Sequence, residues 1–226
     1  MRNYLITYPR SGVNWTINRM KALIKLAGPS LWDRERESRF IRMNHLGFSP
    51  EDPVEGKEFS FEIGNRKIFT ILRDARKCLV SNWYFIQAHS RIQQRLEGRL
   101  PESLRDLNSF LLSPYAVRKY CNFLERIREF KANGHLGKVY FYEDVQDESF
   151  MYDIPTILGV NFTPSAKLAR QAHKASSEVI NTFGTDHTAA SQESLEAVQM
   201  GMNNLCTLEE YRKRYLVEGT TQKEQG

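Results

Sequence analysis

The sequence predicts an α/β protein with a single domain, in which helices flank a parallel β-sheet. Three observations support this class: three short apolar runs that resemble buried strands, helical periodicity after each run, and no internal repeat or linker. Strands that alternate with helices favour a parallel sheet covered on both faces. The domain is predicted to span residues 1–217, followed by a disordered tail at 218–226.

The first third of the chain holds one strand and one helix. Residues 4–7 have the composition of a short buried strand. Apolar residues then recur at helical spacing until Gly28-Pro29, which ends the helix. Residues 28–66 are polar and carry loop-forming prolines, so no regular element is predicted there.

The middle of the chain repeats the pattern. Residues 67–72 (KIFTIL) predict a second buried strand, and residues 76–86 predict a helix. Residues 87–113 are rich in Arg, Gln and Ser and predict a mobile excursion with a short helix near 101–112. Residues 115–132 follow as a strongly amphipathic helix.

The remaining residues predict a third strand and several helices. Residues 138–145 (KVYFYEDV) predict the strand. Residues 149–160 predict a helix closed by Gly159, and the last forty residues predict two weaker helices.

The composition narrows the function. The chain has 226 residues, 41% hydrophobic and 26% charged, and a net charge of +5. This mild basic excess suits an anionic ligand but is weaker than the basic stripe of a nucleic-acid binder, so no nucleic acid is expected. Three scattered cysteines and five scattered histidines predict no metal site and a reducing, cytoplasmic location. No apolar run or leader suggests a membrane, and the sequence carries no signature of oligomeric state.

The turn after the first strand, in YLITYPRSGVNWT (4–16), is a candidate anion site. A strand that turns sharply into a helix aims the unpaired amides of the helix at one point. Gly12 would let the backbone approach a ligand, Ser11 adds a hydroxyl, and Arg10 adds a planar set of donors. The turn is not a Walker A sequence, because it has one glycine and no following lysine. The alternative is a plain turn with Ser11 as the helix N-cap.

A second strand–helix junction, TILRDARKCLVSNWYF (70–85), supplies a second anchor. Arg73 stands at the strand end, and Ser81 follows eight residues later on the helix. Because the ends of parallel strands meet at one edge of a sheet, Arg73 is expected to face another phosphate of the same ligand. The alternative is a local Arg73–Asp74 ion pair with Ser81 on the surface.

Together these segments resemble the PAPS-dependent sulfotransferases, where PAPS is 3′-phosphoadenosine 5′-phosphosulfate and PAP is its desulfated product. YPRSGVNW resembles their phosphosulfate loop, RDARKCLVSNWYF their 3′-phosphate segment, and FYEDV (141–145) a further motif. MNHLGF (43–48) resembles the stretch that carries their catalytic histidine. The resemblance covers roughly residues 4–180 and implies a fold like that of P-loop NTPases, with PAPS as co-substrate and no required metal.

The resemblance implies a role for each matching residue. His45 would be the general base that takes a proton from the acceptor, and Arg10 would stabilise the leaving phosphate. Arg73 and Ser81 would hold the 3′-phosphate. The family has lysines at the position of Arg10 and two residues before the histidine, where this chain has Met43, with Arg42 beside it. The other implied nucleotide-binding residues are Ser11, Gly12, Val13 and Asn14 in the loop and Trp15, Tyr142 and Ser176 near the adenine.

Part of the family pattern is missing. A C-terminal Arg-Lys-Gly clamp on the 3′-phosphate is absent, and FGTDHT (183–188) stands roughly in its place. The acceptor, a small molecule or a glycan, would bind to residues 28–66 and 87–113, which show no readable pattern.

Other function classes stay open. A nucleotide-dependent kinase with a P-loop-like sheet would need Mg²⁺ and a lysine after the loop glycine. A module that binds nucleic acid or polyanions is suggested by the net charge and the Arg-rich residues 87–105, but it would leave His45 unexplained. A catalytically inactive relative that only binds PAP also stays open, because of Met43 and the absent clamp.

Overall fold

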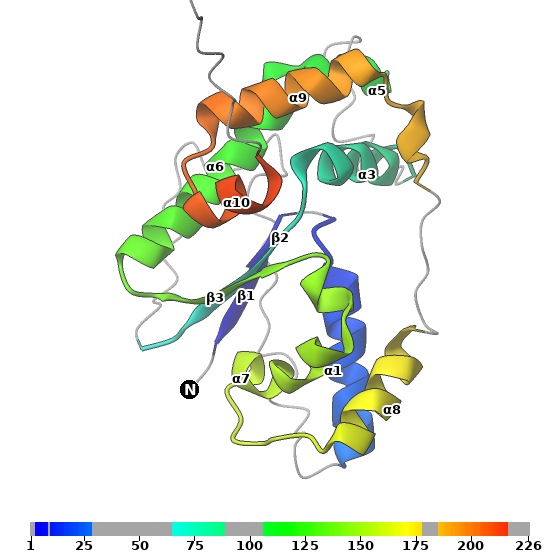
Figure 1. Ribbon diagram of the computed structural model, residues 1–226, viewed down its shortest axis with the longest axis vertical. Coiled ribbons are helices and arrows are strands. Elements are labelled where there is room, and N and C mark those ends of the chain that lie inside the picture. Colours follow the sequence, from blue (N-terminus) through cyan, green and yellow to red (C-terminus); the bar gives the residue numbers. More distant parts are fainter. Residues whose placement is uncertain (1–2, 9, 29–64, 89–105, 178–184, 217–226) are drawn as a thin grey trace, which may run out of the picture.

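The computed structural model describes residues 3–8, 10–28, 65–88, 106–177 and 185–216. These residues form a three-stranded parallel sheet with helices on both faces, which confirms the predicted α/β class. The strands are β1 (Tyr4–Thr7), β2 (Ile68–Leu72) and β3 (Leu136–Phe141), in the spatial order β1-β2-β3 (Figure 1).

The apolar character of the strands follows from burial on both sides. All residues of β1 and β2 are buried. Alternate side chains enter two separate cores: Tyr4, Ile6, Ile68 and Leu72 face one, and Leu5, Phe69, Ile71 and Tyr140 face the other. A strand buried on both faces is apolar throughout, which is why the sequence shows continuous runs and no alternation.

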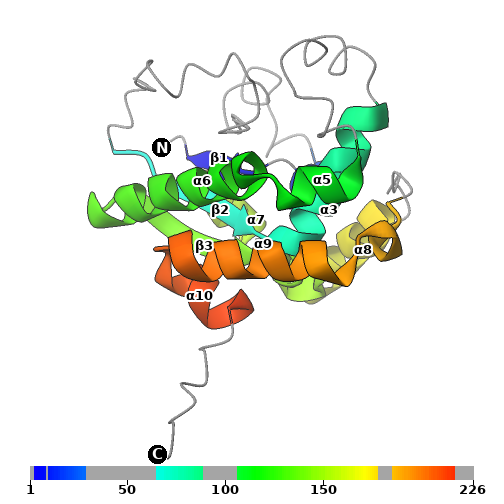
Figure 2. The ribbon, with the colours of Figure 1, turned by 90° about the horizontal axis from the view of Figure 1, so that it is seen from above.

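The first core lies under a layer of five helices. Figure 2 shows this layer over the sheet. Its members are α3 (Ala75–Ala88), α5 (Leu107–Leu112), α6 (Pro114–Ala132), α9 (Gln192–Leu205) and α10 (Glu209–Tyr215).

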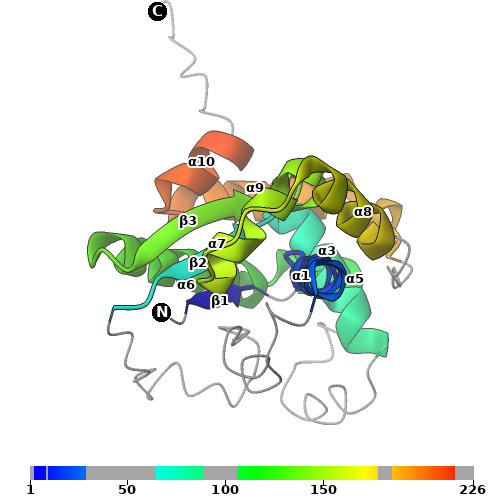
Figure 3. The same cartoon turned by 90° about the horizontal axis from the view of Figure 1, so that it is seen from below.

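The second core lies under α1 (Val13–Ala27), which packs closely against α8 (Ala166–Ser177), as Figure 3 shows from below. The 3₁₀ helices η4 (Asp144–Gln146) and η5 (Glu148–Tyr152) and the short α7 (Ile154–Leu158) complete this layer. A third 3₁₀ helix, η6 (His187–Ala189), packs against α3.

Most predicted elements are present with shifted ends. The first strand and its helix match, and Gly28 caps α1 as expected. The third strand was predicted too long: β3 ends at Phe141, because the Asp144 carboxylate accepts a hydrogen bond from the Phe141 amide and starts a 3₁₀ turn. Tyr142 therefore lies just after the strand.

The prediction of one continuous helix at 149–160 was wrong. It is divided into η5 and α7 around Asp153, and Pro155, which cannot donate a helical hydrogen bond, lies in the first turn of α7. Gly159 ends α7 in the left-handed conformation, as predicted. Helix α8 was not predicted, because it buries only a narrow stripe of small residues: Ala169, Ala172 and Ser176.

Some predictions fall outside the described residues. These are the loop at 29–64, the excursion at 89–105 and the tail at 218–226. Among the helices that the structure does describe, none combines the length and apolarity needed to cross a membrane.

Candidate functional site

The turn between β1 and α1 has an unusual backbone. Arg10 has a φ of 69°, and within the described ranges it is the one non-glycine residue with a positive φ. This conformation costs roughly 1–2 kcal/mol for a residue with a side chain. Two hydrogen bonds hold it: the Ser11 amide donates to the Tyr8 carbonyl at 3.2 Å, and Arg73 Nη1 donates to the Arg10 carbonyl at 2.9 Å.

The N-terminus of α1 is open for an anion. Gly12 is its N-cap, no side chain caps the helix, and its first turn has no acidic residue. Among the described residues, neither a capping side chain nor a first-turn carboxylate therefore satisfies the unpaired amides and the positive end of the helix dipole. The alternative in which Ser11 is the N-cap is wrong, because Gly12 is the N-cap and the buried hydroxyl of Ser11 contacts Cys78 Sγ at 3.6 Å.

Tyr142 packs directly onto this turn. A Cβ atom placed on Gly12 would lie 2.8 Å from Cδ2 of the Tyr142 ring. On the same ring lies Arg73, whose Cζ is 4.2 Å from the centroid, a cation–π contact. Gly12, Arg73 and Tyr142, which come from three different strand ends, thus form one cluster, in which glycine leaves the space that the ring fills.

Arg10 and Ser81 form the second half of the cluster. Arg10 Nε donates a hydrogen bond to Ser81 Oγ at 3.0 Å, and Ser81 Oγ lies 3.5 Å from Thr185 Oγ1. Ser81 is 3% exposed, so it is a buried hydroxyl and not the surface residue of the alternative interpretation. The alternative Arg73–Asp74 ion pair is also absent, because Asp74 pairs with Arg76 at 2.6 Å.

The charges in the cluster favour an anion. Burial and, next, the nearby charge of Arg73 lower the pKa of Arg10. Burial, followed by the charges of Arg73 and Lys77, lowers the pKa of His187. Two guanidinium groups close together repel each other, and a bound anion would relieve this repulsion.

One atom of Arg73 fits such a ligand directly. Its Nε is buried and has no hydrogen-bond partner among the described residues. A buried N–H without an acceptor is costly, and an oxygen of a phosphate would satisfy it. The turn therefore has the donors, the charge and an unsatisfied buried group that an anionic ligand needs.

The structure does not bring every predicted residue into this cluster. Trp15, half-buried on the first turn of α1, contacts Arg19, whose Cζ lies 5.5 Å from the centroid of the Trp15 ring. Ser176 on α8 is buried, and its hydroxyl donates to the His173 carbonyl at 2.7 Å. Asn14 is exposed on the same turn as Trp15, and Val13 begins the helix. His45, Arg42 and Met43 lie outside the described residues.

Two tyrosines that bind the backbone of the second turn were not predicted from the sequence. The Tyr120 hydroxyl on α6 donates to the Arg73 carbonyl at 2.5 Å, and the Tyr211 hydroxyl on α10 accepts from the Ala75 amide at 2.7 Å. Both hydroxyls are buried, and burial raises the pKa of each. Because they reach the turn from distant helices, no local pattern marks them.

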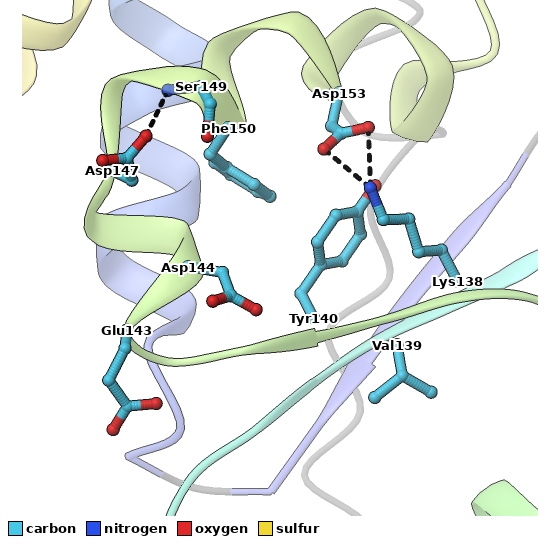
Figure 4. Close-up of a pocket in the computed structure, with 9 residues that line it drawn as sticks. All are labelled: Lys138, Val139, Tyr140, Glu143, Asp144, Asp147, Ser149, Phe150 and Asp153. Atoms are coloured by element: carbon cyan, nitrogen blue, oxygen red, sulfur yellow. Dashed lines mark hydrogen bonds and ion pairs between the residues drawn. The ribbon is translucent and has the colours of Figure 1, made fainter. Parts of the chain in front are cut away.

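A cavity of about 460 Å³ lies elsewhere, beside β3 (Figure 4). Its charged lining is mainly acidic, and the carboxylates have protein partners: Asp153 binds Lys138, Asp147 caps η5, and Glu143 binds Tyr215. An acidic lining disfavours an anion. This cavity is therefore not the candidate site.

Comparisons with known proteins find similarity in structure but none in sequence families. A scan against known protein families and a search of curated proteins find no match. Among solved structures, mouse sulfotransferase SULT7A1 complexed with PAP is similar, at 18% identity and a TM-score of 0.49 over 94% of this chain and 80% of that chain. A likeness this distant does not identify a function, which has to come from the site.

Proposed function

We propose that this protein is a sulfotransferase that uses PAPS as its sulfuryl donor. The observation that carries the proposal is the convergence of two basic strand–helix turns at one edge of a parallel sheet. There Arg10 is bonded to Ser81, and Arg73 keeps a buried N–H that has no acceptor among the described residues. Two anchors of this kind suit a nucleotide with two separate anionic groups, and the quoted sequence motifs match that ligand.

The residues at the first turn would act on the phosphosulfate end. PAPS, when bound, supplies an activated sulfuryl group. Arg10 and the open amides of α1 would stabilise negative charge that develops on the leaving phosphate. Arg10 is a guanidinium and stays charged at neutral pH, so it would act electrostatically and would not donate a proton.

The second turn would recognise the 3′-phosphate. Arg73 would present its Nε to a phosphate oxygen, and Ser81 would donate its own hydroxyl proton while accepting from Arg10. Thr185, from the segment that stands in place of the missing clamp, lies against Ser81. Trp15, Tyr142 and Ser176 would border the adenine.

The transfer step needs a general base, and His45 remains our candidate. An imidazole titrates near neutral pH and can take the proton of an acceptor hydroxyl or amine. A small molecule or a glycan is proposed as the acceptor, with a cytoplasmic location, no required metal, and no role for nucleic acid or membrane.

Thermal unfolding with two ligands tests this function against the kinase alternative. PAP without metal should raise the unfolding midpoint, since a ligand at 100 times its Kd stabilises the folded state by about 2.7 kcal/mol. A rise with ATP and Mg²⁺ but none with PAP would contradict the proposal. A rise with PAP but no sulfuryl transfer from PAPS to a panel of phenols, amines and sugars would indicate binding without catalysis.

A further inference from the structure

Arg19 is a buried cation that links three segments. It lies on α1 with 0% of its surface exposed. Nη1 donates to the Asp147 carbonyl at 3.0 Å and Nη2 to the Gln146 carbonyl at 2.5 Å, while Nη1 lies 2.5 Å from His173 Nδ1 on α8. These contacts satisfy the two terminal nitrogens of the buried guanidinium, whereas its Nε has no partner among the described residues, and they link α1, the 146–147 segment and α8.

The contact with His173 fixes the protonation of the imidazole. A guanidinium has only donors, so Nδ1 of His173 must present its lone pair, and the imidazole must be neutral with its proton on Nε2. Protonation would set an N–H of His173 against an N–H of Arg19. Burial and, next, the charge of Arg19 lower the pKa of His173, while Glu148 and Asp147 oppose this effect.

Trp15 and Ser176, two of the three residues predicted to border the adenine, contact Arg19 and His173. The Trp15 ring packs on the guanidinium of Arg19, and the Ser176 hydroxyl donates to the His173 carbonyl. Helices α1 and α8 lie side by side in Figures 1 and 3. A change at Arg19 or His173 would therefore shift both of these residues.

We propose that Arg19 and His173 are a positioning pair, which holds Trp15 and α8 in place for the nucleotide base only while the imidazole is neutral. This role rests on the proposed function, but the pair itself can be tested without any nucleotide. Neither residue is assigned to the chemical step.

The first test compares three proteins without ligand: the wild type, His173→Asn and His173→Leu. Asparagine places a neutral acceptor near the position of Nδ1 and does not titrate, whereas leucine removes the acceptor. The unfolded chain takes up the imidazole proton more readily than the folded one. The stability given by neutral His173 is thus complete above about pH 6.5 and is lost as the pH falls through its lower folded pKa.

The expected result is a pH-dependent difference between two of the proteins. From pH 7.5 to pH 5, the unfolding midpoint of the wild type should fall by about 2–4 °C relative to that of His173→Asn. The other four histidines are common to both proteins and cancel. Parallel midpoints across this range would overturn the requirement for a neutral imidazole.

The second test measures the positions themselves. In His173→Leu, amide hydrogen exchange should speed up in α8 and not in α6, and PAP should bind about tenfold more weakly, while His173→Asn restores both at pH 7.5. Unchanged amide exchange in α8 would refute the claim that the Arg19–His173 contact holds this helix in place. Faster exchange in α8 with unchanged PAP binding would refute the role of the pair in positioning residues for the adenine. Absence of PAP binding by the wild type would instead refute the proposed function.

Discussion

Gly12 is the residue on which the packing of the turn depends most directly. It has a φ of 102°, and its missing Cβ leaves room for the Tyr142 ring. Gly28, at the other end of α1, has a φ of 99°, but no atom of the described residues lies within 4 Å of a Cβ placed on it. The two glycines therefore share a backbone conformation and differ in their surroundings.

We predict that Gly12→Ala destabilises the protein by about 2 kcal/mol more than Gly28→Ala does. Both variants would bear the strain of a positive φ, so their difference isolates the displacement of Tyr142. Chemical denaturation of the two variants measures it. Equal losses of stability would show that Tyr142 moves freely and does not hold the turn.

A second prediction concerns His45. His45→Ala should lower sulfuryl transfer from PAPS by about 100-fold or more, because general-base catalysis contributes this much. Binding of PAP should stay unchanged, since the residue would act on the acceptor. If PAP binding and transfer decline together, His45 supports the fold of its segment and is not the base.

Single residues at the site were predictable where the signal was local. Arg10 and Gly12 stand in one strand–helix turn, and Arg73 and Ser81 in another, so spacing and motif alone marked them as candidates, and the structure brings them into one cluster. The positive φ of Arg10 was not predictable, because it depends on the hydrogen bond from Arg73, which is 63 positions away.

Two helices of the layer over the first core, α6 and α10, support the second turn through tyrosine hydroxyl groups. Tyr120 on α6 binds the Arg73 backbone, and Tyr211 on α10 binds the Ala75 amide. The two rings lie 5.7 Å apart, edge to face. The packing of α6 and α10 thus fixes where the strand β2 passes into α3.

We predict that Tyr120→Phe lowers the free energy of unfolding by about 1–2 kcal/mol, because it removes a buried hydrogen bond and leaves the Arg73 carbonyl unsatisfied. It should also weaken PAP binding by freeing Arg73. Tyr215→Phe is the matched control, since its hydroxyl binds Glu143 near solvent, where water can replace it. Equal effects of the two variants on PAP affinity would refute a specific role for Tyr120.

Elements were predictable from sequence when they bury a wide apolar face. The strands and α6 meet this condition. Helix α8 does not, because alanines and a serine make up its buried stripe, and it is held largely by contacts with α1. The end of β3 was misjudged because a side-chain cap from Asp144, and not a loss of apolar residues, terminates it.

In the described part of the chain, acidic and basic side chains gather at different places. The net charge is +5, yet the cavity beside β3 is lined mainly by carboxylates, while Arg10, Arg73, Lys77 and His187 adjoin the turns. The open N-terminus of α1 adds to the positive field there. The sequence predicts an anionic ligand, but it could not predict this separation of charge, which depends on how the strands order in the sheet.

The most direct measurement is calorimetric titration of PAP, without metal, into the wild type, Arg73→Ala and Arg118→Ala. Arg118 is exposed on α6, so its loss removes the same charge away from the site. We predict micromolar binding to the wild type and Arg118→Ala, at least about tenfold weaker binding to Arg73→Ala, and weak binding of adenosine 5′-phosphosulfate, which lacks the 3′-phosphate. Absence of PAP binding to the folded wild type, or equal binding to all three proteins, would contradict the account.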